Sequence, residues 1–591
     1  MQRIQWLPLV LALPLLGLGI GCPDGGEGEG EGEGEGEGEG EGEGEGEGEG
    51  ENCTTLSDIT VDTTLSPEDC AFYAPPADIV VSAGATLTLA AGTEIRFADN
   101  RTLRLLDAGL IANGTVDDPV VLRAVDADAD PGSWTGIIAS SQSTGVALTS
   151  TVVQDAGADA GGGIGCLSVQ DGADDIAVVA STFSNCGVAG VGSEMPFDTF
   201  TGNTISSSTV GLSVIADVVG SLTEAVTYHD VTRNVIVDVA VTRSATWVSQ
   251  AIPWHIGADL RVEGPNSPVL TLAAGTDLRF TPDRAFRIGS NDEGGLITAG
   301  TVANPVRLSA IDQSADGGEW TGLVFDANTL SGSSLTNLVI ESGGADAGGG
   351  LGSLTVHAVG RNHISVQGLT VDRCGLAGIG IDDDDAQFLA FSDVTISNAP
   401  TGLALDANVI GSIAEPVTTI NVLNHRIPST TLRQSATWQT QTLPRIVQGG
   451  TLFIAGVNGV PAVVTMTGGE YRFNSSQAVR IGNSGPGGIV ASGAVFGSTD
   501  VNSASGGDWI GFTFGPETVT SSLTNVTIKQ AGQDVGGGLG AMTLFQTGGA
   551  LTITNPVFEH NSQADIFVDC DSTPIITGAG AATVVLEPNC G

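Results

Sequence analysis

The stretch Gly132-Ser133-Trp134-Thr135-Gly136-Ile137 occurs three times in this chain in closely similar form. Its echoes are Gly318-Glu319-Trp320-Thr321-Gly322-Leu323 and Gly507-Asp508-Trp509-Ile510-Gly511-Phe512, and we call each copy a Trp block. The tryptophans are 186 and 189 residues apart, and a run of three glycines follows each block, at residues 161–163, 348–350 and 536–538. Repetition at so regular a distance indicates a structural unit of about 188 residues that is present in three copies.

The residues around each block have the pattern of short β-strands. The stretch Leu87–Phe97 returns as Leu270–Phe280, and in both stretches apolar residues alternate with polar ones around a glycine. Such alternation predicts strands with one buried and one exposed face. Asn337 and Asn525 recur at the same turn, which favours either a left-handed corner or a ladder of side-chain amides. The sequence therefore predicts an all-β fold of strands of four to eight residues.

Short Val, Leu and Thr strands, Gly and Asn turns, and the G-x-W-x-G stretch resemble the repeats of exported bacterial proteins of the pectate-lyase-like β-helix family. The resemblance covers about residues 54–591. It implies a single-stranded, right-handed parallel β-helix solenoid with coils of about 22 residues. The repeats divide it into units at about 54–243, 244–434 and 435–591. The same solenoid carries many activities, so the resemblance is informative about fold and not about function.

The chain is strongly acidic, with a formal net charge of −48 and only 20 lysines and arginines among 591 residues. A phosphate backbone is bound mainly through lysine and arginine, so nucleic acid is excluded as a partner. Mutual repulsion between acidic copies is typical of a soluble exported protein, and we expect a monomer.

The N-terminal 51 residues predict export and attachment to a membrane. Residues 1–22 form a signal-like segment, with Arg3 before an apolar run. The segment ends in Leu18-Gly19-Ile20-Gly21-Cys22, which resembles a bacterial lipobox and implies a lipid on Cys22. Residues 23–51 contain an alternation of glutamate and glycine with 13 glutamates, which predicts a disordered tether. The predicted folded part is residues 52–591, and the predicted location is the bacterial cell envelope, at the outer membrane or cell surface.

Seven further cysteines fit a solenoid with stapled coils. Export makes disulfides chemically plausible, and we expect one pair at each end and one between adjacent coils. In the second unit Cys374 aligns with Cys186 but Ser353 aligns with Cys166, so Cys374 is expected to be an odd, buried thiol. The expected disulfide cysteines are Cys53, Cys70, Cys166, Cys186, Cys570 and Cys590.

Two acidic patterns could carry chemistry. Asp126, Asp128 and Asp130 stand at every second position before a turn and resemble half of a calcium loop, whereas the alternative is a solvated acidic loop. An acid and an arginine stand two residues apart in each unit, which favours ion pairs over an active site because an active site is normally built once. These pairs are Glu94 and Arg96, Asp277 and Arg279, and Glu470 and Arg472.

These features predict a lipid-anchored cell-surface protein with a structural or adhesive role that recognises a glycan or a protein. We find no motif for a phosphate loop, a nucleophile elbow or a zinc site. Two alternatives stay open: a polysaccharide lyase or glycoside hydrolase of the same fold, and a calcium-stabilised solenoid without a ligand. We expect any functional site where the units differ: the loop 126–130, the loop 382–385, or the inserts between coils.

Overall fold

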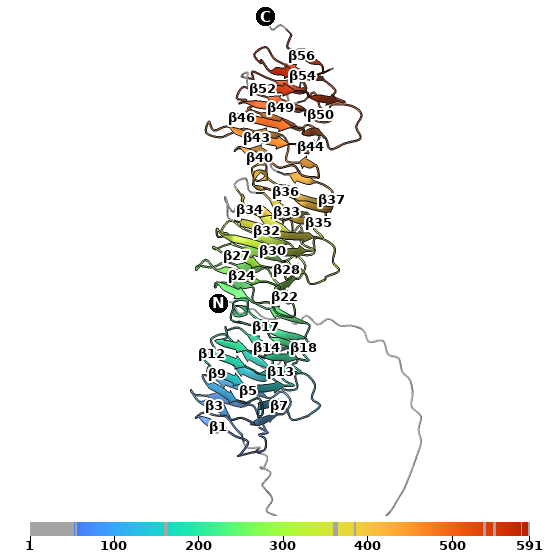
Figure 1. The fold of residues 1–591 in the computed structure, drawn as a ribbon. Helices are drawn as coiled ribbons and strands as arrows, with labels where there is room; N and C mark the ends of the chain where they lie inside the picture. Colours follow the sequence, from blue (N-terminus) through green and yellow to red (C-terminus); the bar gives the residue numbers. More distant parts are fainter. Residues whose placement is uncertain are drawn as a thin grey trace, which may run out of the picture. The chain divides into compact units, whose positions relative to one another are not determined.

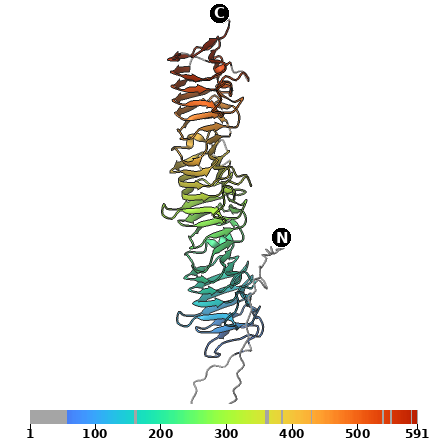
Figure 2. The ribbon, with the colours of Figure 1, turned by 90° about the vertical axis from the view of Figure 1, so that its right-hand side faces the viewer.

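The computed structural model describes residues 53, 56–158, 163–357, 364–382, 386–428, 430–535, 539–547, 551–580 and 582–588, all within one compact unit, Gly50–Gly591. They form 56 short strands, one α-helix, α1 (Ala216–Val219), and one 3-10 helix, η1 (Ile410–Ser412). Every strand pairing is parallel, and strands of successive coils stack in chain order (Figures 1 and 2). The result is an all-β solenoid, consistent with the predicted β-helix. No helix among the described residues is long and apolar enough to span a bilayer.

The core consists of columns of apolar side chains that point inward from stacked strands. In one column Leu87, Leu110, Val146 and Ile176 are fully buried and are neighbours in the register of four successive strands. Each buried leucine of this kind stabilises the fold by about 2 kcal/mol. These strands are β3 (Thr86–Leu89), β6 (Gly109–Asn113), β9 (Thr144–Thr149) and β12 (Asp174–Val179), in a sheet that β1 (Thr63–Leu65) and β15 (Thr199–Thr201) complete.

The coils differ in length more than the sequence suggested. Ala177 pairs with Thr199, which is a coil of 22 residues, but Phe286 pairs with Leu323, which is a coil of 37 residues. The additional residues of the longer coil include the second Trp block and the acidic stretch before it. Inserts of this kind leave the stacked strands in register and extend the turns between them.

Two long strands in the second copy bend around a corner of the solenoid and therefore pair on two faces. They are β30 (Ser333–Glu341) and β32 (Ile364–Asp372). Strand β30 pairs with β27 (Gly295–Ala299) before its bend and with β28 (Val306–Ala310) after it. The bends lie at Asn337 (φ +45°) and Gly368 (φ +70°). Asn525 also has a left-handed backbone, so the predicted left-handed corner is confirmed.

The stack of paired strands that follows one Trp block continues into the stack that carries the next acid–arginine pair. The ladder that contains β8 (Gly136–Ala139), directly after the first block, continues through β11, β14, β17, β19 and β22 to β25 (Asp277–Phe280), which carries the acid–arginine pair of the second copy. The ladder of β29 (Gly322–Phe325), after the second block, likewise reaches β44 (Glu470–Phe473). The strand after each Trp block therefore lies on the face of the solenoid that carries the next acid–arginine pair.

Ten further strands, five in each ladder, connect the ends of these two ladders. The first runs through β11 (Leu167–Val169), β14 (Ala189–Ser193), β17 (Val210–Val214), β19 (Arg233–Ile236) and β22 (Trp254–Ile256). The second runs through β31 (Leu354–Val356), β33 (Ala377–Ile381), β36 (Thr401–Leu405), β38 (His425–Ile427) and β41 (Arg445–Val447).

Candidate functional site

The three tryptophans of the Trp blocks are core residues. Trp134, Trp320 and Trp509 are fully buried, so none can stack on an external sugar. Their indole Nε1 atoms donate hydrogen bonds to the backbone carbonyls of residues 154, 341 and 529 at 2.8, 2.8 and 2.9 Å. Each indole stacks on a phenylalanine from an earlier coil, with ring centroids 4.1, 4.5 and 4.5 Å apart. The Trp block is therefore part of the core in all three places where it occurs.

The glycine two residues after each tryptophan is required by the backbone. Gly136, Gly322 and Gly511 have φ values of +109°, +116° and +108°. A Cβ at these positions would come within 2.6, 2.4 and 2.2 Å of a carbonyl oxygen of the next coil. Only glycine combines this backbone conformation with so close a neighbour.

The described cysteines follow the sequence prediction. Disulfides join Cys53 to Cys70 and Cys166 to Cys186, and Cys374 is a free, buried thiol. Cys570 is also disulfide-bonded. The predicted lipidation residue Cys22 and the cysteine at 590 lie outside the described residues.

The acid–arginine pairs form ion pairs, as predicted. The shortest N–O distances within these pairs are 2.7 Å for Arg96–Glu94, 2.8 Å for Arg279–Asp277 and 2.9 Å for Arg472–Glu470. Burial alone would raise the pKa of Glu94, but two guanidinium groups, one of them from Arg123 on the next coil, hold that pKa below its ordinary value. The three pairs are repeated and partly exposed, so they contribute little to stability and mark no single site.

The predicted calcium set is not assembled. The Asp126 carboxylate accepts the backbone N–H of Asp128 at 3.0 Å, and the Asp130 carbonyl accepts the backbone N–H and hydroxyl of Ser133. These bonds close a tight turn of the chain on itself. Across the part of the chain that the structure describes, no three His, Cys, Asp or Glu side chains gather closely enough to hold a metal ion.

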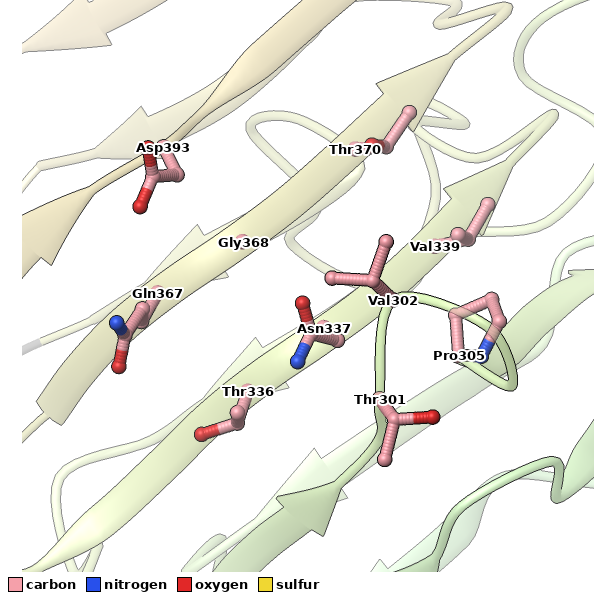
Figure 3. A pocket seen from close by; sticks show the side chains of 10 residues that line it. All are labelled: Thr301, Val302, Pro305, Thr336, Asn337, Val339, Gln367, Gly368, Thr370 and Asp393. Carbon is pink, nitrogen blue, oxygen red and sulfur yellow. The ribbon is translucent and has the colours of Figure 1, made fainter.

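A groove with a volume of about 590 Å³ lies at the corner of the second copy where β30 and β32 bend (Figure 3). A loop at 301–305 overhangs one side, and three successive coils supply the floor. The groove is lined by Thr301, Val302, Pro305, Thr336, Asn337, Val339, Gln367, Gly368, Thr370 and Asp393.

Local structure holds the groove open. The Asn337 side-chain amide donates to the Gly300 carbonyl at 3.0 Å, which ties the overhanging loop to the corner. A Cβ at Gly368 would come 2.6 Å from Asn337 Oδ1, so glycine keeps the floor clear. Gln367 and Asp393 are exposed, and no hydrogen bond joins either side chain to another described residue. These groups are free to bind a ligand.

The residues at the equivalent corner of the first copy differ from those that line the groove. Thr149 takes the place of Thr336, but it pairs with Val179, whereas Thr336 pairs with Gln367. The residues at this corner therefore differ between the first and second copies, although no motif in the sequence singled out the groove. Comparison of the copies in register is the signal that finds it.

A second cluster, in the second copy, lies just beyond the ends of β29, β31 and β33. His357 Nδ1 lies 2.9 Å from Asp382 Oδ1, and His357 Nε2 lies 2.8 Å from the Gly349 carbonyl oxygen. Arg287 pairs with Asp326 at 2.8 Å and donates to the Gly348 carbonyl. Two basic side chains thus hold the glycine run of this copy. Asp382 belongs to the predicted acidic loop, whose other members, 383–385, lie outside the described residues.

His357 is expected to be protonated over a wider pH range than a free histidine. Both ring nitrogens face oxygen acceptors, so the imidazolium with two N–H groups satisfies both contacts. The hydrogen bond to Asp382 raises the pKa of His357 above 6.5, burial opposes the rise, and Asp326 adds to it. The charged groups around the ring are Asp382, Asp326 and Arg287 on the neighbouring coils. Because the folded pKa is raised, this stabilisation is complete below about pH 6.5 and is lost as pH rises through the folded value.

We predict that His357→Gln removes this pH dependence. Glutamine is the residue that the first copy has at the equivalent place, Gln170, directly after β11. NMR titration should give a pKa above 6.5 for His357 in the parent protein and a lower value in Asp382→Asn. Amide exchange at 348–350 should accelerate with pH in the parent beyond the intrinsic rate, and this excess should vanish in His357→Gln. An ordinary or lowered pKa for His357 would contradict the prediction.

Comparison with known proteins supports the fold. Residues 57–165 match the family described as the pectate-lyase like beta helix domain. No curated protein matches the chain. Among solved structures, a mutant of the PL6 family alginate lyase AlyGC aligns over 90% of this chain and 98% of that chain, with 10% sequence identity and a TM-score of 0.15. That TM-score is too low to carry an argument. Residues 57–165 are similar to the pectate-lyase like beta helix domain, and the parallel strand pairings define the class of the fold as an all-β parallel solenoid.

Proposed function

We propose that the protein is an exported bacterial lipoprotein, attached to the membrane through Cys22, that displays a right-handed β-helix of three units at the cell surface. Its role is structural or adhesive, and it recognises a surface glycan as a monomer. The acidic tether at 23–51 separates the lipid from residues 52–591.

The groove at 301–393 is the observation that carries glycan recognition. Its hydroxyl and amide groups suit the hydroxyl groups of a sugar, and Val302, Pro305 and Val339 offer apolar surface for the C–H faces of a ring. Val302 is 91% exposed, so its side chain is accessible to a ligand in the groove. A groove open to solvent along several coils fits an extended chain.

Glycan binding is tested by removing polar groups from the floor of the groove. The double variant Thr336→Ala, Gln367→Ala is expected to lower affinity for a bound polysaccharide at least 10-fold, because two hydrogen-bonding side chains are lost. Thr149→Ala is the matched control, since Thr149 holds the equivalent strand position in the first copy and is not among the residues that line this groove. Retained affinity in the double variant, measured by calorimetry on the full chain, would move recognition elsewhere.

The cluster of Arg287, Asp326, His357 and Asp382 favours a second candidate, a polysaccharide lyase or glycoside hydrolase. Among the described residues, acids, an arginine and a histidine of raised pKa meet at this place in the second copy alone, as a single active site requires. Release of reducing ends or unsaturated products from a polysaccharide panel, abolished by His357→Ala, would establish the enzyme. Binding without any product would leave the adhesive role.

A further inference from the structure

We propose that the groove at 301–393 selects uncharged polysaccharide and rejects polyuronates; this inference rests on the proposed glycan recognition. Among the groove-lining residues there is one carboxylate, Asp393, and there is no lysine, arginine or histidine. A uronate chain carries one carboxylate on every sugar. It would gain no cation here and would meet the Asp393 charge, so its desolvation is not compensated.

The arginine beside the groove does not supply the missing charge. Arg307 is the register partner of the groove residue Val339, but its guanidinium pairs with Glu341 at 3.4 Å. Arg373 of the next coil also pairs with Glu341, at 3.4 Å, and with Asp372 at 3.6 Å. These two guanidinium groups are flanked by two carboxylates, so they leave no net positive charge along this edge of the groove.

The overhanging loop indicates the same preference. In the first copy the loop reads Thr115-Val116-Asp117-Asp118-Pro119, and in the second it reads Thr301-Val302-Ala303-Asn304-Pro305. Two acids have been replaced by uncharged residues at the copy that has the groove. Thr301 still accepts the backbone N–H of Asn304 at 3.0 Å, as Thr115 accepts that of Asp118 at 2.9 Å, so the loop keeps its turn. The difference changes charge and not shape.

The experiment compares matched ligands on the full-length protein. Neutral hexasaccharides of glucose, mannose and galactose are titrated beside the corresponding hexasaccharides of uronic acids with the same linkages. At least one neutral ligand is expected to bind, and its uronate counterpart is expected to bind at least 10-fold more weakly at low salt. The difference in affinity between the neutral ligand and its uronate counterpart should become smaller in 0.5 M NaCl, where charges are screened within a few ångströms. Asp393→Asn should narrow this difference in affinity at low salt by strengthening uronate binding, whereas Asp230→Asn, which changes an exposed acid in the first copy, should not.

Three results separate the two proposals. A uronate that binds as tightly as its neutral partner overturns the selectivity and leaves glycan recognition standing. If neither series binds, glycan recognition itself is overturned. A third result is that the protein prefers neutral ligands, that Asp393→Asn leaves the difference in affinity unchanged, and that Gln367→Ala binds normally. In that case the preference arises outside the groove and the inference fails.

Discussion

Replacing Ser353 with cysteine is expected to create a new disulfide with Cys374 and to stabilise the protein by about 3 kcal/mol. Ser353 and Cys374 occupy the places that Cys166 and Cys186 hold in the first copy. The backbone contacts agree, because Leu323 donates to the Ser353 carbonyl at 2.9 Å as Ile137 donates to that of Cys166 at 3.0 Å. The first-copy pair has a Cα–Cα distance of 5.7 Å, within the range that a disulfide needs.

Formation of this bond removes two electrons and therefore needs an added oxidant. The reaction is expected to be slow, because burial raises the pKa of the Cys374 thiol to about 11. The thiolate that reacts is therefore scarce at neutral pH. Non-reducing peptide mapping should show the 353–374 link, and thermal unfolding should show a rise in Tm that reductant reverses. The double variant Ser353→Cys, Cys374→Ser is the control. It should show no 353–374 link and no rise in Tm that reductant reverses. Two titratable free thiols in oxidised, denatured Ser353→Cys would contradict the alignment of the two copies.

Trp320→Ala is expected to destabilise the second copy by about 4 kcal/mol, the usual cost of removing a large buried aromatic side chain. The substitution removes the stack on Phe280 and leaves the Glu341 carbonyl without its indole donor. Trp320→Phe keeps an aromatic ring in place and loses the hydrogen bond, so a smaller loss of 1–2 kcal/mol is expected.

The loss should be local, because each coil of a solenoid contacts chiefly its neighbours. Hydrogen exchange should show reduced protection from β25 to β31 and unchanged protection in the strands after the third Trp block. Trp509→Ala is the matched control and should give the same effect one copy later. An equal loss of protection along the whole solenoid would show that the copies unfold together and that the local expectation is wrong.

The sequence was informative wherever a feature was repeated. Three copies of the Trp block predicted a repeated structural unit, and the expected pairing of Cys166 with Cys186 predicted the lone thiol at Cys374. The groove could not be predicted in the same way. Thr301, Gln367 and Asp393 are far apart in sequence, and they meet only because particular coils have particular lengths. Coil length ranges at least from 22 to 37 residues, so the sequence alone does not show which residues of neighbouring coils are register partners.

The acidic loop illustrates the same limit. The run at 382–385 was expected to matter because the other copies lack it, and Asp382 does contact His357. The partner could not be named from the sequence, since 25 residues separate the two and six histidines were available. Conversely, the spacing of Asp126, Asp128 and Asp130 suggested a calcium loop, but their turn closes on its own backbone. Spacing along the chain describes a loop poorly when its neighbours belong to other coils.

The shift of the acid–arginine pair from one face to another has a consequence for valency. The ladder after one Trp block becomes the acid–arginine ladder of the next, so equivalent corners of the three copies face three different directions. A flat external surface that lies along the solenoid can therefore contact this corner in only one of the copies. Triplication here does not multiply one contact into three. Each copy addresses its own side, so each can acquire a separate specificity without disturbing the others.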